Sequence, residues 1–166
     1  MKNGKPKWDE SSDAVANART ALPKLVEEYF LLGREVLASE PAPAELHQLR
    51  LASKKLRYTL ELFKGCYGPG LRERIETLKT LQQMLGEIND TVAAERTIAG
   101  VLVAETPESR RAKRFLRKLG AEKSETFRKH WAAVFDAPGH ERWWTEYLAR
   151  QARAAKNGRR RRSGGG

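Results

Sequence analysis

The stretch that decides the fold is residues 46–63, LHQLRLASKKLRYTLELF. On a helical wheel at about 100° per residue, five apolar side chains share one face: Leu49, Ala52, Leu56, Leu60 and Phe63. Four basic side chains, called the basic row below, fall on the opposite side at spacings of 3, 4 and 3: His47, Arg50, Lys54 and Arg57. The stretch therefore predicts a helix with one face in a core and a cationic face outside it.

The rest of the chain shows the same helical spacing. Apolar side chains recur three and four residues apart in five segments, separated by Pro and Gly: residues 13–38, 44–66, 71–104, 108–135 and 141–155. Pro23 predicts a kink or a break inside the first segment. The expected anchors of the fourth segment are Phe115, Leu119, Phe127, Trp131 and Val134. No segment alternates as a strand would, so we predict an all-α protein, a four-helix up-down bundle of long helices with a short extra C-terminal helix.

The ends of the chain, its single cysteine and its apolar runs give three further predictions. Residues 1–10 and the basic tail 158–166 are predicted to be disordered. Cys66 is the one cysteine, so no intrachain disulfide can form, which fits a reducing cytoplasm. The longest apolar runs fall short of the roughly 18 residues that a membrane helix needs, and no secretory signal is visible.

Positive charge is unevenly placed. The net charge is +11; residues 41–64 contribute +3, residues 108–140 contribute +5 and residues 141–166 contribute +6, while the remaining segments are slightly acidic. Such asymmetry attracts polyanions, whether nucleic acid, anionic lipid or polyphosphate.

The basic row suits a linear anion. Like charges three and four residues apart repel by a few tenths of a kcal/mol per pair, and Glu61 relieves one end only. An anion would remove that repulsion, and the row, about 15 Å long at 1.5 Å rise per residue, fits a polymer better than a single phosphate. His47 has no second His, Cys or carboxylate at ligand spacing, so no metal site is expected, and a phosphoryl hydrogen bond is the favoured role.

A second apolar stripe lies beside the basic row and consists of Leu51, Tyr58 and Leu62. Two interpretations stay open: contact with another bundle, such as a second copy of the chain, or cover by the fifth helix with Trp143 and Trp144.

Two segments resemble the CHAD domain, the conserved histidine α-helical domain. HQLRLASKKLRYTLELF at 47–63 is similar to its signature helix, His-x-x-Arg followed by a basic pair, Leu-Arg and an apolar-acidic ending in Phe. LQQMLGEIND at 81–90 is similar to its Leu-x-x-x-Leu-Gly-x-x-x-Asp element. The two matches cover about residues 45–98, the helical pattern extends the similarity to about residue 136, and the predicted domain spans 11–157.

The resemblance implies a bundle that binds inorganic polyphosphate through basic residues in a groove or pore, in the cytoplasm and at polyphosphate granules. By motif, five residues carry over as phosphate contacts: His47, Arg50, Lys54, Lys55 and Arg57. CHAD domains usually have two such halves and this chain has one, most similar to the second half. The resemblance thus implies either a homodimer that rebuilds the pair or one half that binds alone.

Other features leave alternatives. Arg110, Arg114 and Arg117 repeat the basic spacing in the fourth segment and are expected either to form a far wall of the groove or to be a solvated face. Asn89 and Asp90 are candidates to orient a basic side chain, and Asp90 also fits an ordinary surface position. A nucleic-acid-binding helical protein is the alternative function. No enzyme and no cofactor are expected, because the acidic side chains do not converge at a spacing known for metal-dependent phosphohydrolases: Glu73, Glu76, Glu87 and Asp90.

Overall fold

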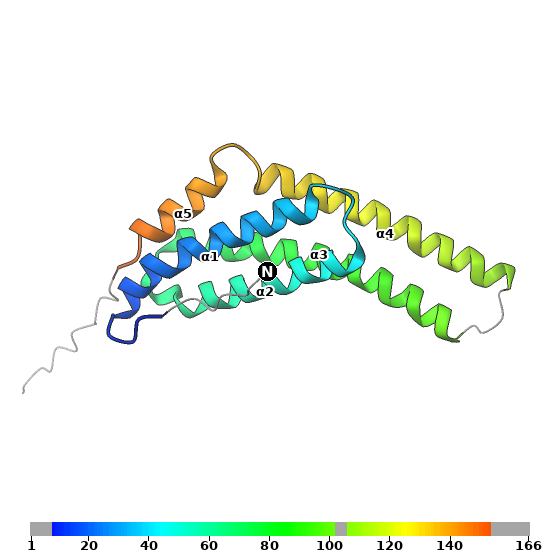
Figure 1. Ribbon diagram of the computed structural model, residues 1–166, viewed down its shortest axis with the longest axis horizontal. Helices are drawn as coiled ribbons and strands as arrows, with labels where there is room; N and C mark the ends of the chain where they lie inside the picture. The colour runs from blue at the N-terminus through cyan, green and yellow to red at the C-terminus, as the bar shows by residue number, and fades with distance from the viewer. Residues whose placement is uncertain (1–7, 102–105, 154–166) are drawn as a thin grey trace, which may run out of the picture.

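The computed structural model describes residues 8–101 and 106–153 (Figure 1). The helices are α1 (Ala14–Leu37), α2 (Pro43–Leu62), α3 (Pro69–Val101), α4 (Pro107–Val134) and α5 (His140–Arg150), with a short 3-10 turn, η1 (Lys64–Cys66), after α2. The described residues contain no strand. Four long antiparallel helices and a short C-terminal one confirm the predicted fold class.

Local chemistry fixes where several helices begin. Asp13 caps α1, because its carboxylate accepts the Ala16 amide at 2.8 Å. Thr106 caps α4 in the same way through the Ser109 amide at 3.2 Å. Pro43 and Pro107 stand at the starts of α2 and α4, where a missing amide hydrogen costs nothing.

Pro23 does not divide the first helix. α1 is one continuous helix from Ala14 to Leu37 with Pro23 inside it, so of the two predicted outcomes, a kink or a break, the break is wrong. The reason is tertiary: the buried residues before and after Pro23, from Ala18 to Val36, belong to one core cluster. Packing along the whole length outweighs the one backbone hydrogen bond that proline removes.

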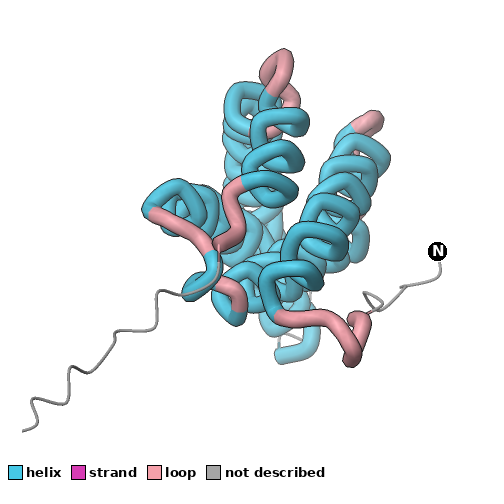
Figure 2. Tube along the Cα trace, turned by 90° about the vertical axis from the view of Figure 1, so that its left-hand side faces the viewer, coloured by secondary structure: helices cyan, strands magenta, loops and turns pink. Residues whose placement is uncertain are grey.

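The helices differ in which neighbours they pack against and over what length. α2 pairs with α3, α3 with α4, and α1 with α2 and α5. The end of α4 is followed by α5 along the same side of α1 (Figure 1). The distal parts of α3 and α4 project beyond α1 and α2 as a two-helix hairpin. Seen from one end of the molecule, the helices lie side by side as a bundle (Figure 2). The bundle is therefore four-membered only over part of its length.

An aromatic cluster joins α1, α4 and α5. The rings of Trp131 and Phe135 stack at 4.6 Å between centroids, and Phe30 and Trp144 close the cluster around Phe135. Gly33 lets α1 approach this cluster, because a Cβ there would lie only 2.0 Å from the Trp131 indole. One expected anchor is wrong: Phe115 is 63% exposed, since it lies on the hairpin, where α4 has only α3 beside it.

Arg74 connects α3 to α5 in an unusual way. Its side chain is buried, and its guanidinium lies 3.4 Å from the Trp143 ring centroid and 3.9 Å from that of Tyr147. It donates to the carbonyls of Gly70 at 3.0 Å and Trp143 at 2.8 Å. Burial lowers the pKa of Arg74 to about 10. Aromatic faces and backbone carbonyls thus hold α5 against α3.

Candidate polyanion-binding site

The basic row lies along the contact between α2 and α3, which run antiparallel. His47 Nδ1 is 3.2 Å from Asn89 Oδ1, and Arg57 Nε donates to Gln82 Oε1 at 3.0 Å. Between them, Arg50 lies over Gly86, with its Nε 3.8 Å from the position that a Cβ would take. Three residues of α3 therefore face three members of the basic row, and we call Gln82, Gly86 and Asn89 the α3 seam.

Arg57 is the most constrained member of the row. Besides Gln82, it contacts Glu61 in an ion pair of 2.8 Å, and its guanidinium lies 4.3 Å from the centroid of the Tyr58 ring. Gln82 also donates to the Ser53 carbonyl at 2.9 Å, which ties this end of the seam to the α2 backbone. The Glu61 partner agrees with the i, i+4 spacing in the sequence.

Arg50, Lys54 and Lys55 have no acidic partner among the described residues. Arg50 is half-buried, and its Nε is buried without a hydrogen bond to any described group. Lys54 and Lys55 are exposed, and the Lys54 ammonium lies 5.7 Å from the Tyr58 ring centroid. Three cations close together on one helix without compensating charge favour an anion beside them.

The α3 seam was only partly visible in the sequence. Asn89 takes the expected role, because it contacts the ring of His47. Gln82 went unrecognised, and a single glutamine on a long helix gives no periodic signal. Its role depends on the register between α2 and α3, which a pattern within one helix does not encode.

The three arginines of α4 that the sequence singles out lie in different surroundings from the basic row of α2. Arg117 pairs with Glu95 of α3 at 2.6 Å, on the projecting hairpin, while Arg110 and Arg114 are exposed further towards its tip. α4 makes its main contacts with α3. The structure thus places these three arginines beside the distal half of α3, whereas His47, Arg50 and Arg57 contact its middle.

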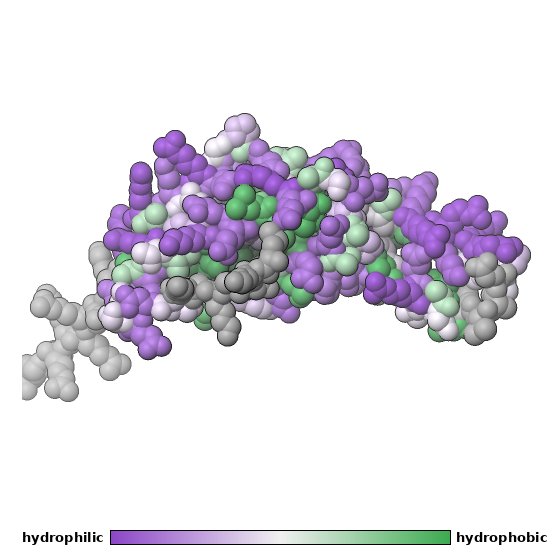
Figure 3. Space-filling view, viewed as in Figure 1, coloured by the Kyte–Doolittle hydropathy of each residue, from purple (hydrophilic) through white to green (hydrophobic). Residues whose placement is uncertain are grey.

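No helix of the described structure covers the second apolar stripe. Leu51 and Tyr58 are nearly half exposed and Leu62 is 82% exposed. α5 packs on α1 instead, with Trp144 in the core and Trp143 on Arg74, so the interpretation that α5 covers the stripe is wrong. The surface in the view of Figure 3 is mainly hydrophilic, with apolar residues in small patches.

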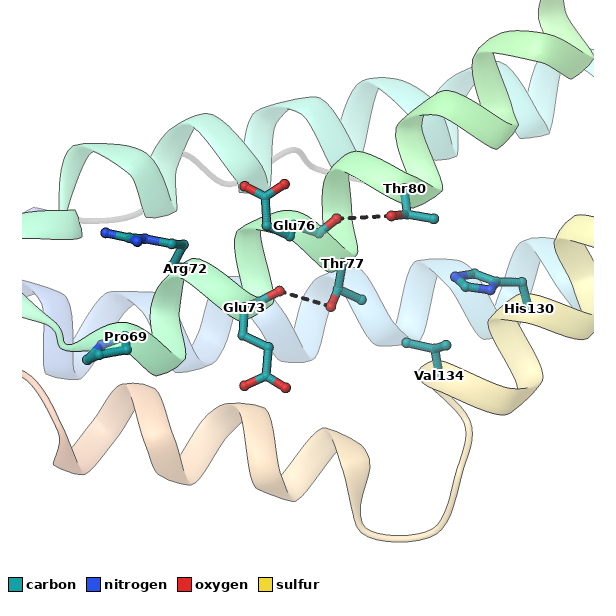
Figure 4. A pocket seen from close by; sticks show the side chains of 8 residues that line it. All are labelled: Pro69, Arg72, Glu73, Glu76, Thr77, Thr80, His130 and Val134. Carbon is teal, nitrogen blue, oxygen red and sulfur yellow. Dashed lines mark hydrogen bonds between the residues drawn. The ribbon is translucent and has the colours of Figure 1, made fainter.

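A shallow groove of about 580 Å³ lies elsewhere, between the first half of α3 and the end of α4 (Figure 4). Glu73 and Glu76 point to opposite sides of it, and the Thr77 and Thr80 hydroxyls donate to the carbonyls of those two residues at 3.0 and 3.2 Å. Its carboxylates do not favour a polyanion. Across the described residues, no group of three or more His, Cys, Asp or Glu side chains could hold a metal ion.

The family follows from a comparison with known domains. The model of the CHAD domain matches residues 3–99, more than half of the chain, and this span includes α1, α2 and almost all of α3. The chain belongs to the CHAD domain family. The basic row and the α3 seam lie inside the matched span, whereas α4 and α5 follow it. No curated protein and no solved structure matches the chain.

The described helices of this CHAD domain do not include one that is both long enough and apolar enough to cross a membrane.

Proposed function

We propose that this CHAD domain is a non-catalytic module that binds inorganic polyphosphate along the basic row. The observation that carries the proposal is the state of Arg50, Lys54 and Lys55, which lie within one and a half turns of α2 without an acidic partner among the described residues. Arginine can grip phosphoryl oxygens with its planar fork, and lysine adds mobile positive charge. Membership of the CHAD family, which is linked to polyphosphate, supports this ligand over other polyanions.

Affinity measurements with long-chain polyphosphate test the proposal. We expect salt-sensitive binding that Arg50→Ala and Lys54→Ala each weaken about 10-fold, because a charge-assisted contact contributes about 1.5–3 kcal/mol. Lys129→Ala is the matched control, since Lys129 is exposed on α4 and pairs with Glu125 at 3.5 Å. Wild-type affinity in both row variants, together with equal binding of heparin, would remove the basic row as the site.

Nucleic acid is the alternative ligand, and one observation bears on it. Tyr58 is half exposed beside the row and could stack on a base, but Arg57 already lies over its ring at 4.3 Å. We therefore expect duplex and single-stranded DNA to displace polyphosphate poorly at equal phosphate concentration. Efficient displacement would favour the nucleic-acid function.

A homodimer would complete the site. The exposed stripe of Leu51, Tyr58 and Leu62 lies on α2 away from its buried residues and beside the basic row. Suppose that two copies meet on this stripe and are related by a two-fold axis that lies in the interface at right angles to α2. The two α2 helices then run antiparallel, and their basic rows lie on the same side of the dimer. Two rows of like charge repel until an anion lies between them, so polyphosphate should promote the dimer.

Light scattering with and without polyphosphate tests the dimer. We expect the polymer to raise the molar mass to that of two chains, and the double change Leu51→Glu with Leu62→Glu to keep the protein monomeric. A protein that saturates with polymer and stays monomeric would show that one half binds alone. In cells, we propose a cytoplasmic location at polyphosphate granules, which fluorescence co-localisation would test.

A further inference from the structure

Gly86 lies in the middle of α3, a helix of 33 residues, although glycine is the least favourable residue there after proline. A close approach of helices often requires glycine at such a position, as at Gly33. At Gly86, however, a Cβ would meet no backbone and no packed ring. Outside the neighbouring residues and the backbone of α3 itself, the one heavy atom within 4 Å of it is the Arg50 Nε, at 3.8 Å.

The other two residues of the α3 seam act through hydrogen bonds. Asn89 contacts the His47 ring, and Gln82 accepts from Arg57. At the position between them, α3 offers Arg50 only an open strip of backbone. The Arg50 Nε, 3.8 Å from the position of a Cβ on Gly86, is buried without a hydrogen bond to any described group, and the guanidinium has no acidic partner in the described chain.

We propose that Gly86 is a positioning residue for Arg50. Because Gly86 has no side chain, the Arg50 side chain can lie against α3, which fixes its stem while its terminal nitrogens stay available to an anion. A methyl group at residue 86 would make only ordinary contact with Nε, but a longer side chain would occupy the volume of the guanidinium and turn Arg50 away. The consequence for affinity rests on the proposed polyphosphate function; the placement of Arg50 does not.

The test replaces Gly86 with Ala, Leu or Gln and compares each variant with Gly100→Leu. Gly100 is the matched control, because it lies on the same helix and a Cβ there meets nothing within 4 Å. Three quantities are measured: the melting temperature, the NMR signal of the Arg50 Nε–H group, identified by its loss in Arg50→Lys, and the affinity for long-chain polyphosphate.

We expect the Gly86 substitutions to raise the melting temperature by about 2–4 °C, since each replaces a glycine in a helix interior, and Gly100→Leu to raise it less, because Gly100 is next to the last residue of α3. Gly86→Leu and Gly86→Gln should shift the Arg50 signal and weaken polyphosphate binding at least about 5-fold, and Gly86→Ala should have a smaller effect on both. Gly100→Leu should leave the Arg50 signal in place and the affinity within about twofold of the wild type. In an Arg50→Ala background, Gly86→Leu should cause no further loss. A more stable protein that binds more weakly is an outcome that a purely structural role of Gly86 does not produce.

Two results separate this inference from the proposed function. An Arg50 signal that stays unchanged in both Gly86→Leu and Gly86→Gln overturns the positioning role, whatever the ligand. A wild-type protein that fails to bind polyphosphate, but whose Arg50 signal moves on substitution of Gly86, overturns the function and keeps the positioning role.

Discussion

Helices α2 and α4 are both rich in arginine and lysine, but their charges are neutralised to different degrees. On α4, Arg117 and Lys123 each pair with a glutamate of α3 at 2.6 Å. Lys118 and Lys129 have glutamates one turn away on their own helix. On α2, the ion pair of Arg57 with Glu61 is the only one among the basic side chains in the described structure.

The difference bears on the proposed polyanion site, because a helix can carry a high net charge that is already paired within the protein. α4 carries more positive charge, yet much of it already stabilises the helix hairpin. α2 carries less, but Arg50, Lys54 and Lys55 have no acidic partner among the described residues. Four predictions test this contrast, beginning with the largest expected effect.

Two double variants that remove the same charge should differ most. We expect Arg50→Ala with Lys54→Ala to weaken polyphosphate binding about 100-fold, and Arg114→Ala with Arg117→Ala to weaken it less than about 3-fold, because the first pair loses direct contacts and the second only long-range attraction. Fluorescence anisotropy at fixed salt measures both. Equal losses would show instead that the α4 arginines form the far wall of the groove.

Arg57 should affect stability more than binding. Its guanidinium is held by Gln82, Glu61 and the Tyr58 ring, so Arg57→Ala should destabilise the fold by about 1 kcal/mol while weakening polyphosphate binding only about 2- to 3-fold. Urea unfolding and a binding titration of the same preparation measure the two effects. A loss of affinity as large as that of Arg50→Ala would place Arg57 among the main contacts.

Removing charge should move stability in opposite directions on the two helices. Lys54→Gln should stabilise the unliganded protein by a few tenths of a kcal/mol, because it removes like-charge repulsion within the row. Glu95→Gln should destabilise it by about 0.5 kcal/mol, because Arg117 loses its partner on a partly exposed surface. Thermal unfolding at low salt shows the signs, and about 0.5 M NaCl should reduce both effects.

The pairing of α4 with α3 should also appear in the pH dependence of stability. The Lys123 ammonium, with help from Gln83, lowers the pKa of the Glu87 carboxyl below its ordinary value of 4.5. The unfolded chain therefore takes up this proton first, so the contribution of the pair is complete above about pH 4.5 and disappears as the pH falls through the lowered pKa.

Glu87→Gln should accordingly melt below the wild type at pH 7, and the two melting curves should converge in acid. A constant difference between pH 7 and pH 3 would exclude a role for this carboxylate in the pH dependence.

Much of the architecture was predictable because it depends on patterns within single helices. The boundaries that Pro and Gly set between the helices, and the apolar spacing that buries Leu71 to Ile88 of α3, could be read from the sequence, and the helical wheel placed the basic row outside the core. Residues 1–7 and 154–166, which include nearly all of the predicted disordered ends, lie outside the described structure; Trp8 already stacks on Phe63.

What could not be predicted depends on contacts between helices. Phe115 fits a core position on its own helix, but it is exposed on α4, whose main contacts are with α3. Gln82 and Gly86 acquire their roles only from the register of α3 against α2. The continuity of α1 through Pro23 likewise depends on a core that proline propensity alone does not describe.

Helix α3 connects two parts of the molecule. Its 33 residues make it about 50 Å long, and it belongs both to the bundle and to the projecting hairpin. From Gly86 to its end at Val101, α3 extends for roughly 22 Å. The same helix therefore carries the hairpin and the α3 seam, so a displacement of the hairpin along the α3 axis would also displace Gly86 and Asn89 relative to Arg50 and His47.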